Sequence, residues 1–182
     1  MADENLVTLL STTFLVLAAL AAVTSSEATT KYQCQNLKET NIVFYMHDLV
    51  TGSNITAKMV AADPDKPWSA FNFGTVSVAD DKLTEEYSWN SREIGRVRGT
   101  YFVSAVDGSD DNVILSLLFT TKEFNGSTLE VQGCIFQNKE LSVVSGTGKF
   151  RMARGFAILD TAYFNASTLN SVLKWNVKVL HY

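Results

Sequence analysis

Hydrophobic and polar side chains alternate along most of the chain from Asn41 onwards, with the two-residue period of half-buried β-strands. Gly, Pro, Asn and Asp residues interrupt the alternation, as in Asp63-Pro-Asp-Lys-Pro67 and Ser145-Gly-Thr-Gly148, and supply the backbone angles that hairpin turns require. The predicted strands are rich in Val, Ile, Phe, Tyr and Thr. They span residues 41–50, 69–79, 98–106, 113–121, 128–136, 141–144, 150–164 and 172–180.

Eight short strands at hairpin spacing favour an eight-stranded antiparallel β-barrel. Closure removes the exposed edges of the sheet, and a barrel of this size leaves room for side chains or one small ligand. A β-sandwich is the alternative. No linker or change of composition divides residues 27–182, so we expect a single domain there.

The first 26 residues have a different pattern. Residues 6–23 are largely apolar and are followed by the small-residue run Thr24-Ser25-Ser26, which is the order of parts in a secretory signal peptide. Acidic residues at the N-terminus depart from the usual basic start, and a membrane anchor is the alternative because the run is long enough to cross a bilayer. We expect residues 1–26 to be removed and the mature chain to be secreted, with no membrane association after cleavage.

Secretion would expose three acceptor sequences for N-linked glycans, at Asn54, Asn125 and Asn165. Their number is close to what the composition gives by chance and proves nothing by itself, so they are candidates only if the leader is cleaved. The two cysteines, Cys34 and Cys134, would form one disulfide in an oxidising compartment or remain as two free thiols. The sequence leaves both alternatives open.

Charge and composition exclude several classes of protein. The chain has 15 Lys and Arg residues against 19 Asp and Glu residues, without a basic block, so nucleic acid is not an expected partner. Two His and two Cys residues without metal-ligand spacing predict no metal site, and no nucleotide or flavin motif is present. We therefore expect no cofactor.

The first predicted strand carries the strongest candidate for chemistry. Its two-residue period places Phe44, Met46 and Asp48 on one face and His47 on the other. If the first face lines the barrel, Asp48 is a carboxylic acid in an apolar cavity, where desolvation raises its pKa and lets it lend a proton. Alternatively, Asp48 ends the strand and accepts hydrogen bonds from the following turn. His47 points away from the barrel interior and is expected to be a surface or interface residue.

Further along, several motifs occur in a characteristic order, and the chain closes with residues 160–163 and the alternating segment 175–181. The motifs are Phe44-Tyr-Met-His-Asp48, Ser91-Arg-Glu-Ile-Gly-Arg-Val-Arg-Gly-Thr-Tyr101, Phe124-Asn-Gly-Ser-Thr-Leu129 and Val143-Val-Ser-Gly-Thr-Gly-Lys-Phe-Arg-Met-Ala-Arg-Gly-Phe156. Together they resemble the plant dirigent protein family over nearly the whole mature chain.

The resemblance implies a secreted, glycosylated, eight-stranded β-barrel of the type shared with allene oxide cyclase, assembled as a homotrimer or homodimer in the extracellular space. It also implies a role in lignan-type phenylpropanoid biosynthesis, with no cofactor. Such proteins impart regio- and stereoselectivity on the coupling of phenoxy radicals from monolignols, or on quinone-methide cyclisation. A separate laccase or peroxidase supplies the radicals. The alternatives are a lipocalin-like carrier of small phenolics and an allene oxide cyclase-like isomerase.

The resemblance also assigns roles to single residues. Asp48 matches a family acid, and Tyr101 is a candidate contact for a phenol, with ordinary barrel packing as its alternative. Pinoresinol-forming relatives carry an additional Asp in a Gly-Ala-Asp-like turn and an Arg in the strand that follows. This chain lacks that Asp, and Lys139 falls at the Arg position, where an ammonium cannot reproduce the two-pronged guanidinium contact.

Arg154 is the remaining candidate. It shares a strand face with Phe150 and Met152, so we expect it to enter the barrel, with an ion pair to Asp160 or Glu93 as the alternative. The expected lining of the pocket comprises four apolar side chains. These are Phe44, Met46, Phe150 and Met152.

Overall fold

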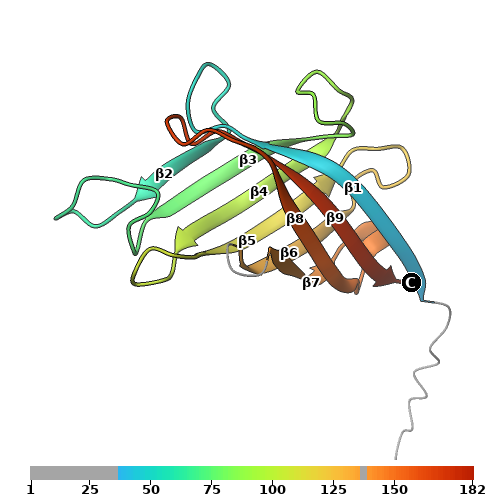
Figure 1. Cartoon of the computed structure of the whole chain (residues 1–182). Coiled ribbons are helices and arrows are strands. Elements are labelled where there is room, and N and C mark those ends of the chain that lie inside the picture. Colours follow the sequence, from blue (N-terminus) through green and yellow to red (C-terminus); the bar gives the residue numbers. More distant parts are fainter. Residues whose placement is uncertain (1–36, 136–138) are drawn as a thin grey trace, which may run out of the picture. The chain divides into compact units, whose positions relative to one another are not determined.

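Antiparallel strands form most of the computed structural model, which describes residues 37–135 and 139–182 (Figure 1). A single 3-10 turn, η1 (Gly148–Phe150), interrupts them. The strands are β1 (Lys38–Asp48), β2 (Ala57–Ala61), β3 (Val76–Thr84), β4 (Glu93–Val103), β5 (Asp111–Phe119), β6 (Thr128–Cys134), β7 (Glu140–Gly146), β8 (Arg154–Phe164) and β9 (Ser171–His181). The expected signal peptide and Cys34 lie outside the described residues.

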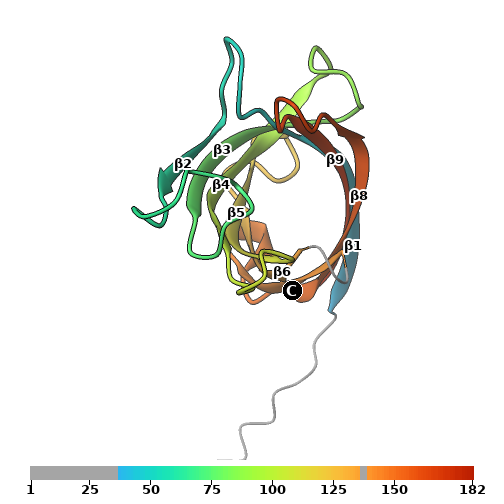
Figure 2. The ribbon, with the colours of Figure 1, turned by 60° about the vertical axis from the view of Figure 1, so that its left-hand side comes forward.

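The sheet closes on itself, as the view in Figure 2 shows. Hydrogen-bonded neighbours follow the order β1-β9-β8-β7-β6-β5-β4-β3, and a further pairing of β3 with β1 completes a ring of eight strands. Residues 82–84 of β3 pair with β1, whereas residues 76–79 pair with the short strand β2. The predicted eight-stranded antiparallel barrel is confirmed.

The boundaries of two strands, and one strand that was not predicted, are the differences from the sequence prediction that bear on the site. Strand β3 covers residues 76–84, whereas the sequence predicted a strand over 69–79. The apolar residues Phe71 and Phe73 lie instead in a loop of successive turns, in which Asn72 N–H donates to the Ser69 carbonyl and Thr75 N–H donates to the Asn72 carbonyl. The five-residue strand β2 was not predicted. Similarly, β8 begins at Arg154 rather than at residue 150, because Met152 has a positive φ of 62° that breaks the extended chain.

One end of the barrel is filled by aromatic rings, here called the aromatic plug: Phe44, Phe119, Phe150 and Trp175. Phe44 stacks on Trp175 with ring centroids 5.8 Å apart, and Phe119 meets Phe44 and Phe150 edge to face at 6.4 and 5.6 Å. All four side chains have at most 1% of their surface exposed. Aromatic rings in such geometries add stabilisation beyond their buried area. Within residues 37–135 and 139–182, no helix is long and apolar enough to cross a membrane.

Candidate functional site

The other end of the barrel is hollow. A cavity of about 390 Å³ is lined mostly by apolar side chains, including Met46, Leu115 and Leu159. Along β5, the inward residues Asp111, Val113 and Leu115 line this cavity, whereas Leu117 and Phe119, further along the same face, are packed in the core. The volume and the apolar lining with a few polar groups are typical of a small-molecule site.

Two aspartates lie side by side in the cavity wall where β1 meets β3. The register pairs Met46 with Leu83 and His47 with Lys82, so the next position on each strand places Asp48 opposite Asp81. Residues opposite each other on one face of an antiparallel pair have Cβ atoms roughly 5 Å apart. Both carboxyl groups line the cavity, and in each the Oδ1 atom is buried without a hydrogen-bond partner in the described part of the chain. The wall therefore presents two adjacent, desolvated acids.

Burial and mutual repulsion keep protons on this pair. Desolvation raises the pKa of Asp48 to about 6. The pKa of Asp81 is raised well above its ordinary value, first by burial and then by the negative charge of Asp48, while a hydrogen bond with Thr56 opposes this shift. Because like charges at this distance disfavour double ionisation, the pair holds one proton over a wide pH range, with one carboxylic acid and one carboxylate.

Sequence reasoning found Asp48 but missed Asp81. Ser77, Asp81 and Leu83 are buried and alternate with more exposed positions along β3, which is the two-residue signal of an inward face. The predicted strand ended at Ala79, two residues before Asp81. A strand extended through Thr84 would have placed this acid on the same inward face.

Tyr101 of β4 lines the same cavity, four residues along the strand from Val97, which pairs with Asp81. In the register it faces Ser77 of β3 and Val113 of β5, and all three line the cavity. Burial raises the pKa of its phenol, and the negative charge of Asp48 raises it further. Tyr101 therefore stays protonated at any physiological pH and can donate a hydrogen bond to an oxygen atom in the cavity.

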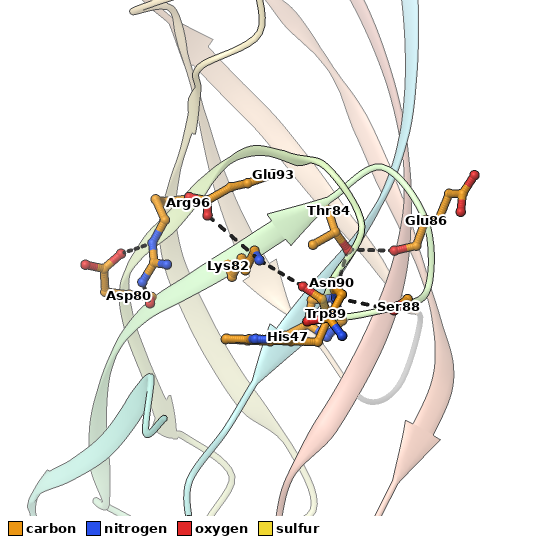
Figure 3. A network of polar contacts seen from close by, with 10 residues as sticks. All are labelled: His47, Asp80, Lys82, Thr84, Glu86, Ser88, Trp89, Asn90, Glu93 and Arg96. Atoms are coloured by element: carbon orange, nitrogen blue, oxygen red, sulfur yellow. Dashed lines mark hydrogen bonds and ion pairs between the residues drawn. The ribbon is translucent and has the colours of Figure 1, made fainter. Parts of the chain in front are cut away.

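The outer side of the β1–β3 junction is covered by the loop that joins β3 to β4 (Figure 3). The Thr84 hydroxyl donates to the Glu86 carbonyl at 2.6 Å, so His47 Nε2–H donates to Thr84 Oγ1 at 2.8 Å. Lys82 Nζ donates to the Trp89 carbonyl at 2.8 Å and lies 4.8 Å from the centre of the Trp89 ring. Strands β1 and β3 share only three residue pairs, and these contacts help to hold them together. They thereby fix the positions of the facing Asp48 and Asp81.

The expectation that His47 is a surface residue was wrong. Its side chain is 3% exposed and meets the Trp89 ring edge to face at 5.4 Å. It does point away from the barrel interior, but the loop folds over it. Burial and the nearby Lys82 charge lower its pKa, so His47 is a neutral structural residue at neutral pH.

Asp111 and Lys139 line the cavity close to its mouth. Asp111 begins β5, and its backbone carbonyl accepts a hydrogen bond from Ile135 N–H at 3.0 Å. Burial raises the pKa of its carboxyl to about 6, with a smaller contribution from the charge of Asp110. Lys139 is exposed and adopts a positive φ of 49°, just before β7. The structure thus places Lys139 at the cavity.

Four other expected pocket residues lie elsewhere. Arg154 is exposed at the start of β8 and donates to the Ala153 carbonyl at 2.9 Å, because the strand and its alternation begin only there. Met152 is 63% exposed, and Phe150 belongs to the aromatic plug. Phe44 faces inward as predicted but lies in the plug rather than in the cavity wall. Of the four predicted apolar lining residues, Met46 alone lines the cavity.

The glycan acceptors lie in loops of the described chain. Asn54 and Asn125 are exposed, whereas Asn165 is half-buried and its Oδ1 accepts hydrogen bonds from the Ser167 and Thr168 backbone.

Among residues 37–135 and 139–182, no group of three His, Cys, Asp or Glu side chains could hold a metal ion. The candidate site consists of the facing acids Asp48 and Asp81, the phenol of Tyr101 and a third acid, Asp111, around an apolar cavity.

Comparison with known proteins identifies the family. Residues 39–180 match the family described as Dirigent: Dirigent-like protein. Dirigent protein 1 of Arabidopsis thaliana is 37% identical over 172 residues, which cover 91% of this chain and 92% of that protein. Pterocarpan synthase 1 of Glycyrrhiza echinata is 31% identical over 185 residues, covering 94% of this chain and 98% of that protein. The solved structure of the pterocarpan synthase dirigent protein GePTS1 gives a TM-score of 0.76 at 30% identity, covering 86% of this chain and 96% of that one. The chain therefore belongs to the dirigent family.

Proposed function

We propose that this chain holds a phenolic quinone methide in its barrel cavity and directs ring closure by proton transfer at the Asp48–Asp81 pair. The facing, desolvated carboxyl groups carry this proposal, since they supply a proton donor and a proton acceptor side by side. Relatives named pterocarpan synthase are compatible with a cyclisation, and relatives named dirigent protein with stereochemical guidance.

The proton transfers balance without a cofactor. The protonated member of the pair donates to the quinone-methide oxygen, which becomes a phenol hydroxyl and leaves the exocyclic carbon electrophilic. A hydroxyl group of the same substrate attacks this carbon and forms a carbon–oxygen bond. Its proton passes to the ionised member of the pair, so the pair again carries one proton. Substrate and product are isomers, and no oxidant is consumed.

The same cavity would serve radical coupling. A separate laccase or peroxidase removes one electron and one proton from each phenol, and two phenoxy radicals then join without an acid catalyst to give a quinone methide. The protein contributes orientation at this step, and a preference of about 1.4 kcal/mol between two approaches gives tenfold selectivity. The proposal also includes secretion to the extracellular space, where such oxidases would meet the protein. It further includes assembly as a homotrimer or homodimer.

The apolar walls and Tyr101 would fix the handedness of the product. Met46, Leu115 and Leu159 can contact the faces of aromatic rings and exclude water from the reacting carbon. The Tyr101 phenol remains a hydrogen-bond donor for a substrate oxygen. A substrate held in this way exposes one face of its electrophilic carbon to the attacking hydroxyl.

Chiral chromatography of the products tests the proposal with two substrates. One is coniferyl alcohol with a laccase, and the other is a two-ring phenol with a benzylic alcohol that loses water to give a quinone methide. Wild-type protein should give an excess of one enantiomer, and Asp48→Asn and Asp81→Asn should give nearly racemic product. Asp160→Asn is the matched control, because Asp160 is an exposed acid on β8.

Racemic product from both substrates with wild-type protein would overturn the proposal. Saturable binding of these phenols without any change in product would instead identify a carrier. If both Asp→Asn variants kept full selectivity, the assigned role of the aspartate pair would be wrong even if the protein still guides the reaction.

A further inference from the structure

We propose that Asp111 is a specificity-determining residue that binds a hydroxyl group on the ring of the substrate remote from the reacting carbon. This inference rests on the proposed function and extends it, because it names the substrate class as a two-ring phenolic with a free hydroxyl group at each end. It also assigns a role to the one acid in the cavity that the proton transfers above do not use.

The position of Asp111 sets it apart from the aspartate pair. The register places Asp81 level with Val97 of β4 and Leu117 of β5. Asp111 lies six residues from Leu117 on the same face of β5, a separation of about 20 Å along the strand at 3.3 Å per residue. The aspartate pair and Asp111 therefore lie at different positions along the strands, with Val113 and Leu115 between them on the inner face of β5. An extended two-ring molecule can reach both.

The side chains between the two ends suit such a molecule. Tyr101, opposite Val113, is on an intermediate level, and Leu115 adds an apolar surface between Asp111 and the deeper pair. One ring would therefore lie near the aspartate pair and the other against the wall near Asp111. Polar groups at both ends with an apolar stretch between them match the chemistry of a diphenol.

Asp111 is also free to accept a hydrogen bond. In the described part of the chain, its side chain has no ion pair and no hydrogen bond, and its carboxyl is neither fully buried nor fully exposed. Its pKa of about 6 leaves it mostly ionised at neutral pH. A phenol hydroxyl would donate to this carboxylate, and hydrogen bonds to charged groups are among the stronger ones in proteins.

The cationic Lys139 at the same end of the cavity favours the same class of ligand. Lys139 lies close in the chain to Ile135, which is hydrogen-bonded to Asp111, and both residues line the cavity. A hydroxyl group at this end of the cavity can donate to a carboxylate and accept from an ammonium. A methyl ether at this position could accept from Lys139 but could not donate to Asp111.

Binding measurements with two inert probes test the inference without any turnover. The probes are a trans-stilbene with one hydroxyl group on each ring and its mono-methyl ether, titrated by calorimetry at neutral pH. The ether can place its remaining hydroxyl at the aspartate pair, so a preference for the diol reports a second hydroxyl contact. Wild-type protein should bind the diol about tenfold more tightly than the ether.

In Asp111→Ala this preference should disappear, whereas the exposed-acid control Asp160→Ala should keep it. Asp111→Asn retains an amide oxygen that accepts a hydrogen bond, so it should keep part of the preference and provides a second variant if Asp111→Ala fails to fold. The inference is overturned if wild-type protein binds both probes equally, binds neither, or keeps its preference in Asp111→Ala. A preference that depends on Asp111 in a protein without cyclising activity would support this site while contradicting the proposed function.

Discussion

The two ends of the barrel use the same strands for opposite purposes. On β5, Leu117 and Phe119 point inward and are fully packed, whereas Asp111, Val113 and Leu115 point inward on the same face and border a cavity. The aromatic plug fills the space between the strands at one end. At the other end the space stays open, and carboxyl groups are held there away from water. The difference indicates that the packed end stabilises the fold, whereas the hollow end is the candidate site for the proposed chemistry.

The hollow end lowers the stability of the fold. Burying a carboxyl without a hydrogen-bond partner is unfavourable, and Asp48 and Asp81 each have a buried oxygen of this kind within the described residues. These acids persist because the surrounding strands fix them: β1 forms eleven pairs with β9, and the Lys82–Trp89 contacts cover its junction with β3. Strain of this sort at a site is a common sign of function.

The largest expected effect separates activity from stability at Asp81. In Asp81→Asn, stereoselective turnover should fall by about 10²- to 10⁴-fold, the usual contribution of a positioned proton donor or acceptor. The midpoint of urea unfolding at neutral pH should rise, because an uncharged amide replaces a desolvated acid next to Asp48. Activity assays and unfolding curves on the same preparation measure both. A variant that loses both activity and stability would contradict the view that Asp81 serves activity and lowers the stability of the fold.

A matched pair of leucines on β5 tests the packed end against the hollow end. Leu117→Ala should lower the free energy of unfolding by about 2–5 kcal/mol, since it opens a new cavity in the core. Leu115→Ala should lower it by at least about 1 kcal/mol less, because Leu115 already borders an open space on one side and makes fewer contacts there. Urea denaturation of both variants gives the difference. Equal losses would mean that the cavity wall is packed as tightly as the plug.

The stability of the wild-type protein should depend on pH in the direction that buried acids dictate. Unfolded Asp residues lose their protons near pH 3.8, whereas folded Asp48 and Asp111 keep theirs up to about pH 6. The folded state therefore binds more protons in this window, and stability is full below it and falls as the pH rises through it. We expect a loss of roughly 1–3 kcal/mol between about pH 4 and pH 7.

Thermal unfolding across this pH range measures the effect. The double variant Asp48→Asn, Asp111→Asn should show a flatter dependence. Groups with lowered pKa values act in the opposite direction: Asp63 mainly below this window, Glu85 at its acidic end, and His47, whose pKa is lowered from 6.5, within it. A wild-type melting temperature that rises from pH 4 to pH 7 would contradict the assignment of raised pKa values to the cavity acids.

The sequence predicted the barrel and one half of the acid pair because both depend on local alternation. Strand β1 has a regular two-residue period, so Met46 and Asp48 could be assigned to the inner face. Asp81 was missed because it lies beyond the predicted strand end, and its meeting with Asp48 depends on a β1–β3 pairing that no local pattern contains. His47 was misplaced for a related reason, since the loop that covers it comes from residues nearly forty positions further along the chain.

The smallest expected effect concerns Arg154. The sequence prediction continued the two-residue alternation from residue 150 through a point where the strand is broken. The positive φ of Met152 changes the direction of the chain, so Arg154 lies outside the barrel. Arg154→Ala should leave the free energy of unfolding within about 0.5 kcal/mol of wild type, as is usual for exposed positions, and should not change the enantiomeric excess of the product. Lys139→Ala, at the cavity, is the informative companion, because it should weaken binding of the stilbene diol while Arg154→Ala should not. If Arg154→Ala reduced selectivity as strongly as Asp48→Asn, the outer face of β8 would have to belong to the site, and the division into a packed and a hollow end would not account for the function.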